Sequence, residues 1–475
     1  MKRLLPYILF LTAASGCKKY LEAPLPITSI AGSSAFSNDA TSAATLSGVY
    51  GFLYSQGDFD GNGSVSSQTG LYSDELMNLS SLPSNQALYE DQVSSTIGGV
   101  TTMWSNLYGQ LYTVNLAIEG LTPATNLNYR NQWLGEAYFL RGLSYFYLTN
   151  LYGDVPLVLS SNYLTNNTLT RSLQADVYKQ IVTDLLQAQS LLGSGYHNAN
   201  GLVTQDRGRP GRAAATALLS RVYLYTGDWK DAETQADSLI TDATDYQLPA
   251  LAKTFLVNSP EIIWGIEPFQ GGTYPYMVKD AVNYYVPNGK APVAAGILAT
   301  LSDSLVNAFE PGDARYTNWV GTDTVAASGS TPMTIYYYAY KYKAIGSFTA
   351  PQESLVLFRL AEQYLIRAEA RAEQNNLAGA LTDLNTVRTR AGLPASTAVS
   401  QTDILSAIQR ERRVELFTEV GHRFFDLRRT GALDALMTVV APQKGGSWAS
   451  YKAWWPISLT DIQNDVHLAQ TPGFQ

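Results

Sequence analysis

The sequence has few of the residues that build metal clusters and covalent cross-links. Among its 475 residues are 3 histidines and 1 cysteine. A zinc cluster of Cys and His ligands, an iron–sulfur cluster and an internal disulfide framework all need more. Basic residues are also in the minority, because 32 Lys and Arg stand against 40 Asp and Glu, a formal net charge of -8. Without a basic excess to neutralise phosphates, we expect no nucleic-acid partner.

Sequence motifs of common catalytic sites are missing as well. His197, His422 and His467 lie far apart, and none belongs to an H-E-x-x-H pattern. The chain has neither a G-x-S-x-G nucleophile motif nor a G-x-x-x-x-G-K-[ST] phosphate loop. Two carboxylates for glycoside hydrolysis could come from distant segments, but nothing favours a particular pair. We expect a protein that is not an enzyme and requires no cofactor.

Apolar and aromatic side chains are abundant. Hydrophobic residues make up 45% of the sequence, which holds 31 Tyr, 15 Phe and 8 Trp. This composition is too apolar for a disordered chain and predicts a large core. The length allows two or three domains or one large fold. The rings serve either to pack helices together or to stack on a ligand.

The first residues have the order of a secretory signal. A basic start, MKR, precedes the apolar stretch LLPYILFLTAA, which is too short to span a membrane as a helix. The run ASGC that follows resembles a bacterial lipoprotein signal, in which Cys17 becomes the acylated first residue of the mature chain. We predict a signal peptide over residues 1–16 and a lipidated tether over residues 17–34, attached to a membrane through the acyl chains.

Periodic apolar residues predict helices along most of the remaining chain. Residues 354–372 carry one apolar stripe. A helix over 377–390 stops before Gly392, and a third begins at Ser400 or Thr402 and runs to about Phe417. Further helices are predicted over residues 103–121, 132–151, 175–192, 212–225 and 230–240.

Two of the predicted helix pairs look like tetratricopeptide hairpins. In the first, the turn Gly227-Asp228-Trp229 is followed by the small residues Ala232 and Ala236. Residues 360–388 show the same pattern of a helix pair with small residues. Residues 55–71 and 271–340 have turn chemistry with short β-like runs such as 334–340. We expect the hairpins to form a scaffold and the irregular segments to carry binding sites.

Several segments in one order carry a resemblance to a known family. They are EAYFLRGLSYFYLTNLYGDVPLV (136–158), FRLAEQYLIRAEARAEQ (358–374), LNTVRTRAGLP (384–394), ERRVELFTEVGHRFFDLRRTG (411–431) and WWPISLTDIQNDVHLAQTPGF (454–474). In these segments the chain resembles the SusD/RagB family of surface lipoproteins of Bacteroidota. The resemblance implies a mostly α, single SusD-like fold, built on tetratricopeptide-like hairpins, with a loop-rich ligand-binding face and short β segments. It divides the mature chain into an N-terminal helical region (35–250), a loop-rich segment (251–350) and a C-terminal helical region (351–475).

The resemblance also implies a function at the cell surface. Such a protein binds a glycan without cleaving it and delivers it to a SusC-like TonB-dependent transporter in the outer membrane. Two alternatives stay open: a peptide ligand, as in the RagB branch, and a purely structural lid or scaffold of the transporter complex.

The most strongly patterned residues are predicted to be structural. Charges of alternating sign at helical spacing in residues 411–429 predict ion pairs between helices rather than an anion site. Tyr138, Phe139, Tyr145, Phe146 and Tyr147 lie on a helix that is apolar almost all round, which predicts core rings rather than a ligand platform.

A sugar site needs flat ring faces and a few amides, carboxylates or guanidinium groups for the hydroxyls. In the resembling family, ligand-contacting rings come from the loop ahead of the helix that contains Trp104 here and from the middle irregular segment. This regional correspondence gives the candidates Tyr89, Asn85, Phe269, Tyr274, Tyr276, Tyr284, Tyr285 and Trp319, with Gln86 near the first two. The alternative for each ring is packing onto its own loop.

One loop has the spacing of a calcium site. Asp58, Asp60 and Asn62, followed by Gly63, match the first ligand positions and the glycine of a calcium loop. The twelfth position is Thr69, so the bidentate Glu is absent. A plain turn of Gly, Asp and Asn explains the same residues, and calcium remains an option.

Overall fold

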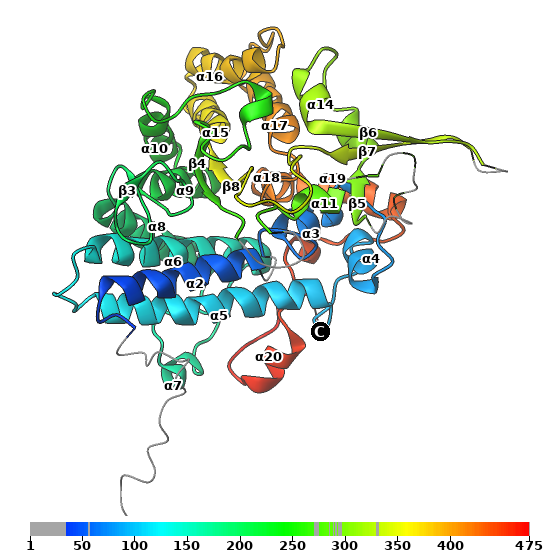
Figure 1. The fold of residues 1–475 in the computed structure, drawn as a ribbon. Helices are drawn as coiled ribbons and strands as arrows, with labels where there is room; N and C mark the ends of the chain where they lie inside the picture. The colour runs from blue at the N-terminus through cyan, green and yellow to red at the C-terminus, as the bar shows by residue number, and fades with distance from the viewer. Residues whose placement is uncertain are drawn as a thin grey trace, which may run out of the picture.

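The computed structural model describes residues 35–55, 58–269, 275–284, 286–287, 289, 292, 297–328 and 332–474. The predicted signal peptide, Cys17 and the tether therefore lie outside the described residues. The described part is mostly helical with a few short strands, which confirms the predicted fold class (Figure 1). None of the helices described is long and apolar enough to cross a membrane.

The N-terminal region is a layer of long helices. α2 (Asp39–Ser55), α5 (Gly98–Leu121) and α6 (Arg130–Tyr152) run beside one another, and α8 (Gln174–Leu191) packs along α6 (Figure 1). α6 is buried on nearly all sides because its neighbours cover an almost continuous apolar surface. The predicted core rings Phe139, Tyr145, Phe146 and Tyr147 are buried, while Tyr138 is half-buried.

The predicted hairpins form a second helical layer. They consist of α9 (Arg212–Thr226) with α10 (Trp229–Ile240), α15 (Leu360–Glu373) with α16 (Leu377–Arg390), and the following α17 (Gln401–Glu415). α10 packs against both α9 and α15, where Ala232, Ala236 and Ala370 are buried together. Small side chains let these helices approach closely, as the pattern predicted. Ser400 caps α17 by accepting a hydrogen bond from the N–H of Asp403.

Four antiparallel two-stranded sheets occur in the described part of the chain. Their pairs are β1 (Leu76–Asn78) with β5 (Ala299–Leu301), β2 (Tyr196–His197) with β3 (Val203–Thr204), β4 (Ile262–Ile266) with β8 (Leu355–Arg359), and β6 (Val320–Val325) with β7 (Thr334–Ala339). β7 confirms the predicted strand-like run. The prediction of one helix over 354–372 is wrong in its first part, because 355–359 form the fully buried β8.

The remaining elements lie around these layers. They are α3 (Val65–Tyr72), α4 (Pro83–Tyr89), α7 (Tyr163–Asn166), α11 (Asp280–Tyr284), α13 (Asp303–Val306), α14 (Ala314–Trp319), α18 (His422–Arg429), α19 (Leu433–Gln443) and α20 (Leu459–Asn464), with the 3-10 turns η2 (Leu251–Lys253) and η3 (Ser450–Ala453). The prediction of turn chemistry throughout 55–71 is wrong for α3, whose residues are all buried. Its N-cap, Ser64, accepts a hydrogen bond from the N–H of Ser67.

Ion pairs tie the C-terminal helices together, as the alternating charges predicted. Arg412 of α17 pairs with Asp426 of α18 at 2.7 Å, and Arg429 of α18 pairs with Glu369 of α15. Arg315 of α14 reaches Glu411 of α17 at 2.6 Å. These groups are nearly all buried, so they connect elements and present no open anion site.

Candidate ligand-binding face

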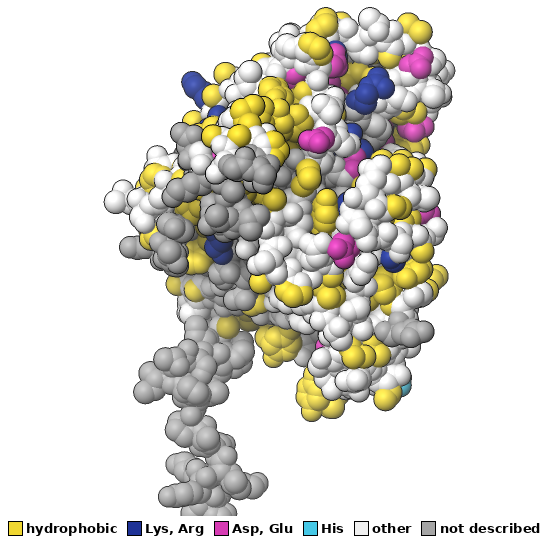
Figure 2. Space-filling model, turned by 90° about the vertical axis from the view of Figure 1, so that its right-hand side faces the viewer, with side chains coloured by type: hydrophobic (Ala, Val, Ile, Leu, Met, Phe, Trp, Pro, Cys, Tyr) yellow, Lys and Arg dark blue, Asp and Glu magenta, His cyan; other side chains and the backbone are white. Residues whose placement is uncertain are grey.

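The pairing of β1 with β5 brings together the two regions that the sequence indicated for ligand binding. Leu76 lies opposite Leu301 and Asn78 opposite Ala299, although more than two hundred residues separate them. α4 follows β1, and α11 contacts β5. We use the name β1–β5 face for the surface formed by the accessible side chains of residues 76–90, 269 and 275–284, which adjoin the buried residues 297–301. Its elements lie on the side of the molecule that Figure 2 turns toward the viewer, where apolar side chains outnumber charged ones.

A chain of polar side chains runs over α4 on this face. The Asn78 Nδ2 donates to Gln86 Oε1 at 2.7 Å, and the Gln86 Nε2 donates to Glu90 Oε1 at 2.6 Å. Gln86 and Glu90 meet because four residues make about one helical turn. Gln86 is exposed and its two partners are half-buried. Amide and carboxylate groups held in this way are well placed to bind hydroxyl groups.

Tyr89 and Asn85, both sequence candidates, occupy different environments on α4. Tyr89 is half-buried with Lys444 Nζ 5.3 Å from its ring centroid, and burial together with the charge of Asp91 raises the pKa of its hydroxyl. Asn85 is buried and donates to Ser80 Oγ at 3.0 Å. The prediction that Asn85 faces a ligand is therefore wrong for this conformation, since its amide holds the turn before α4.

Phe269 and Tyr276 form a second aromatic element of the face. Phe269 is 41% exposed and packs edge to face on Tyr54 at 5.0 Å. The Tyr276 N–H donates to the Phe269 carbonyl at 3.2 Å, which holds these two residues close together. Tyr276 has φ +59°, a left-handed conformation that is uncommon for a bulky residue and that fixes where its half-buried ring stands.

Two other ring candidates belong to the core. Trp319 is 0% exposed, and its indole N–H donates to the Leu251 carbonyl at 3.1 Å. Tyr284 is buried, with its hydroxyl 3.1 Å from Ser67 Oγ. A ring stacks on a sugar only where one of its faces is open, so the prediction of ligand contact is wrong for both. Tyr274 and Tyr285 lie outside the described residues.

The sequence candidates did not include Asn78 and Glu90. The spacing of Gln86 and Glu90 by four residues is a readable signal, because it places both side chains on one side of a helix. The position of Asn78 depends on the pairing of β1 with β5, and three-residue strands leave no periodic signal that predicts a distant partner.

The candidate calcium loop directs its carboxylates to protein donors. Asp58 accepts from Asn106 Nδ2 at 2.8 Å and from Gln110 Nε2 at 3.1 Å. Asp60 accepts from backbone N–H groups of the segment that leads into α11, and Asn62 is exposed. Burial raises the pKa of Asp58 to about 7 and that of Asp60 to about 6. No group of three or more acidic, His or Cys side chains suited to a metal occurs among the described residues. This geometry gives the calcium hypothesis no support.

Comparisons with known proteins agree with this architecture. A family model described as "SusD family" matches residues 283–474, and one described as "Starch-binding associating with outer membrane" matches residues 33–224. The starch-binding protein SusD of Bacteroides thetaiotaomicron is 25% identical over 90% of both chains.

Solved structures share the fold over nearly the whole chain. A SusD superfamily protein from Bacteroides vulgatus has a TM-score of 0.77 at 20% identity, covering 92% of this chain and 100% of its own. Surface glycan-binding protein A from Bacteroides fluxus has a TM-score of 0.74 at 22% identity, covering 91% and 99%. Tetratricopeptide-like hairpins beside a face of short strands thus define a protein with the SusD fold. The two family models settle the family: the chain belongs to the SusD/RagB family.

Proposed function

We propose that this protein is a surface lipoprotein of the outer membrane that binds an oligosaccharide or polysaccharide and delivers it to a SusC-like TonB-dependent transporter without cleaving it. The observation that carries the proposal is the β1–β5 face, where the polar chain from Asn78 to Glu90 follows the strand that pairs with β5. The open ring of Phe269 belongs to the same face because its carbonyl accepts from Tyr276, in the segment before α11, and α11 contacts β5.

The chemistry of this face suits a sugar. The apolar CH groups of a pyranose lie flat on a ring, and fixed amide and carboxylate groups bind the hydroxyls. The names of the family members support this ligand class, since one is a starch-binding protein and another a glycan-binding protein. The description of the N-terminal family model supports association with the outer membrane.

The binding proposal is tested by calorimetric titration of the protein with oligosaccharides of several linkage types and with mixed oligopeptides. We expect heat of binding with one class of oligosaccharide. Phe269→Ala and Gln86→Ala should each weaken that binding by about tenfold, which is the effect of losing about 1.4 kcal/mol. A matched control is Tyr163→Ala, because Tyr163 on α7 is 72% exposed and far from this face (Figure 1).

Two results would contradict the proposal. Binding to oligopeptides alone would favour a peptide ligand, and unchanged affinity in both variants would place the glycan elsewhere. Delivery is tested separately by asking whether a TonB-dependent transporter copurifies with the protein from detergent-solubilised outer membranes. If none copurifies, the partnership is rejected while the binding result stands.

A further inference from the structure

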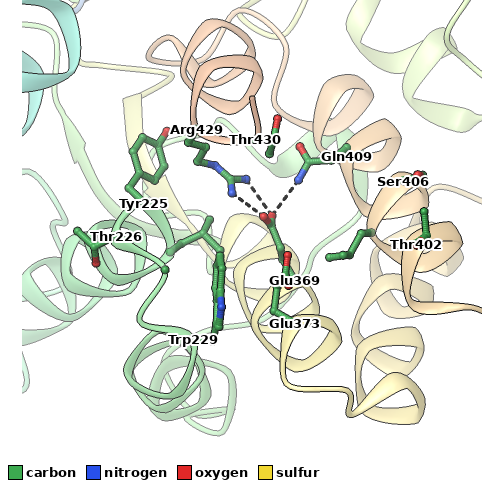
Figure 3. A pocket seen from close by; sticks show the side chains of 13 residues that line it. Tyr225, Thr226, Trp229, Glu369, Glu373, Thr402, Ser406, Gln409, Arg429 and Thr430 are labelled. Atoms are coloured by element: carbon green, nitrogen blue, oxygen red, sulfur yellow. Dashed lines mark hydrogen bonds and ion pairs between the residues drawn. The ribbon is translucent and has the colours of Figure 1, made fainter. Parts of the chain in front are cut away.

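A hollow of about 790 Å³ lies in the hairpin layer, separate from the β1–β5 face. It is open on one side and is lined by the end of α9, the start of α10, one side each of α15 and α17, and the end of α18 (Figure 3). Its volume falls within the range of small-molecule sites. None of its lining residues belongs to the β1–β5 face, so it is a distinct feature.

Two walls of the hollow present polar groups at helical spacing. Thr402, Ser406 and Gln409 project from α17, and Glu369 and Glu373 project from α15 (Figure 3). Intervals of three and four residues place each set on one side of its helix. Thr402 and Ser406 are exposed, and their hydroxyls make no side-chain hydrogen bond among the interactions of the described residues.

The two carboxylates of the α15 wall differ in their surroundings. Glu369 accepts from Arg429 Nη2 at 2.8 Å and from Gln409 Nε2 at 3.0 Å, so it is held in place (Figure 3). Glu373 is half-buried one turn further along α15 and has no ion pair within the described part of the molecule. The Glu373 carboxylate is therefore a hydrogen-bond acceptor available to a ligand, and it lies next to the Glu369 carboxylate, which is already held in place.

Aromatic rings form the third wall of the hollow, at the end of α9 and the start of α10. Trp229 stands between the hollow and α10 (Figure 3), half-buried, and its position is set by the turn before it. Gly227 ends α9 with φ +76°, and Asp228 caps α10. The Tyr225 hydroxyl, at the same wall, is buried and has no hydrogen-bond partner among the residues that the structure describes. A buried hydroxyl without a partner costs free energy until a ligand or water bonds it.

We propose that this hollow is a second carbohydrate site, which takes one or two units of a neutral sugar. The sugar ring lies on Trp229, and its hydroxyls bond Glu373, Ser406 and Thr402. Sugar hydroxyls donate and accept, which matches walls that carry both carboxylates and hydroxyls. Two carboxylates against one guanidinium disfavour an anionic ligand such as a phosphate. The lining of the hollow supports this site by itself, independently of the function proposed for the β1–β5 face.

The site is tested by hydrogen-exchange mass spectrometry of the full chain with maltohexaose, laminarihexaose and cellohexaose in turn. We expect at least one of these sugars to slow exchange in residues 224–230 and 402–410. Trp229→Ala should weaken the affinity measured from this protection by at least about tenfold, because the stacking surface is lost. Trp229→Phe should restore most of the affinity, and Phe269→Ala should leave the protection of these segments unchanged.

A second variant keeps the test valid if Trp229→Ala does not fold. Thr402→Val removes a hydroxyl at an exposed position of α17 while nearly preserving the size of the side chain, and we expect a loss of affinity of about threefold to tenfold. The proposal is overturned if none of the three sugars protects these segments, or if protection persists unchanged in both variants. Failure here with intact binding at the β1–β5 face would reject only the second site.

Discussion

Glu415 is the centre of a buried ion network that joins elements from distant parts of the chain. It contacts Arg359 at 2.6 Å and Arg315 at 2.9 Å, and it also pairs with Arg390. Burial by itself raises the pKa of Glu415, but the three guanidinium groups outweigh burial and hold the pKa well below its usual range. The carboxylate therefore stays charged at neutral pH and balances cations that cannot reach water.

Replacing this carboxylate should be costly. We expect Glu415→Gln to lower the free energy of unfolding by about 3–5 kcal/mol, because it removes the one carboxylate that three buried guanidinium groups share and leaves each of them with fewer acidic partners. Urea denaturation checks this value. Lys179→Ala is the matched control, since the Lys179–Asp176 pair is exposed, with Lys179 at 77%, and should change stability by about 0.5 kcal/mol or less. Equal effects of the two variants would refute the structural role of the network.

The raised pKa of Asp58 should make the free energy of unfolding decrease as the pH rises. Burial raises its folded pKa to about 7, whereas an unfolded Asp titrates near 4. Between these values the folded state binds the extra proton, so the stability that Asp58 contributes is fully present below about pH 4 and is lost as the pH rises to about 7. Relative to Asp58→Asn, the unmodified protein should lose about 1.4 kcal/mol per pH unit in this interval.

The measurement is urea denaturation of both proteins at pH 4.5, 5.5, 6.5 and 7.5. Asn keeps the size of the side chain and does not titrate, so the difference between the two curves isolates Asp58. A constant difference across the series would show that Asp58 is ionised in the folded protein over the whole interval.

At the scale of elements, the long amphipathic helices were readable from the sequence and the short elements were not. The helix predicted over 377–390 matches α16, and those over 212–225 and 230–240 match α9 and α10 within one residue at each end. Repeated apolar positions over three or more turns carry that information. A five-residue strand that is buried on both faces, such as β8, has no alternation of apolar and polar residues. Its sequence is therefore easily taken for the start of the helix that follows it.

The candidate site shows the same limit. Within the two regions that the sequence indicated, Phe269 and Tyr276 are partly exposed, whereas Trp319 and Tyr284 are buried. Which ring in a loop faces water depends on tertiary packing, for example the contact of Trp319 with Phe255 at 5.7 Å between centroids. Composition and local spacing carry no information on such contacts.

The close approach of α6 and α8 depends on a glycine. A Cβ on Gly135 would lie 2.8 Å from a Leu192 side-chain carbon, closer than packed atoms tolerate. We expect Gly135→Ala to lower the free energy of unfolding by about 1–3 kcal/mol through overpacking. Gly48→Ala in α2 is the control, because a Cβ there meets nothing within 4 Å and should stabilise the helix by about 0.5–1 kcal/mol. Stabilisation by both variants in urea denaturation would contradict the close contact.

At the scale of the whole molecule, the two proposed sugar sites lie on different layers of one fold. The β1–β5 face is made by short strands and loops, while the hollow beside Trp229 is made by the ends of packed helices. A polysaccharide has many equivalent units, so two sites on one protein raise the effective concentration of chain at each site. Membrane attachment would hold both sites at the cell surface, which makes the state of Cys17 decisive for the proposed function.

Cys17→Ser tests that attachment directly. Each buried methylene of an acyl chain contributes about 0.8 kcal/mol, and stable anchoring takes two membrane signals such as dual acylation. Removal of the predicted acylation site takes away the acyl chains, so it should move the protein from the membrane pellet to the soluble fraction after cell lysis. Immunoblots of the two fractions measure this shift, with Ser33→Ala in the predicted tether as the control that stays in the pellet. A Cys17→Ser protein that still sediments with the membranes would show that a different contact holds it there and would reject the lipid anchor.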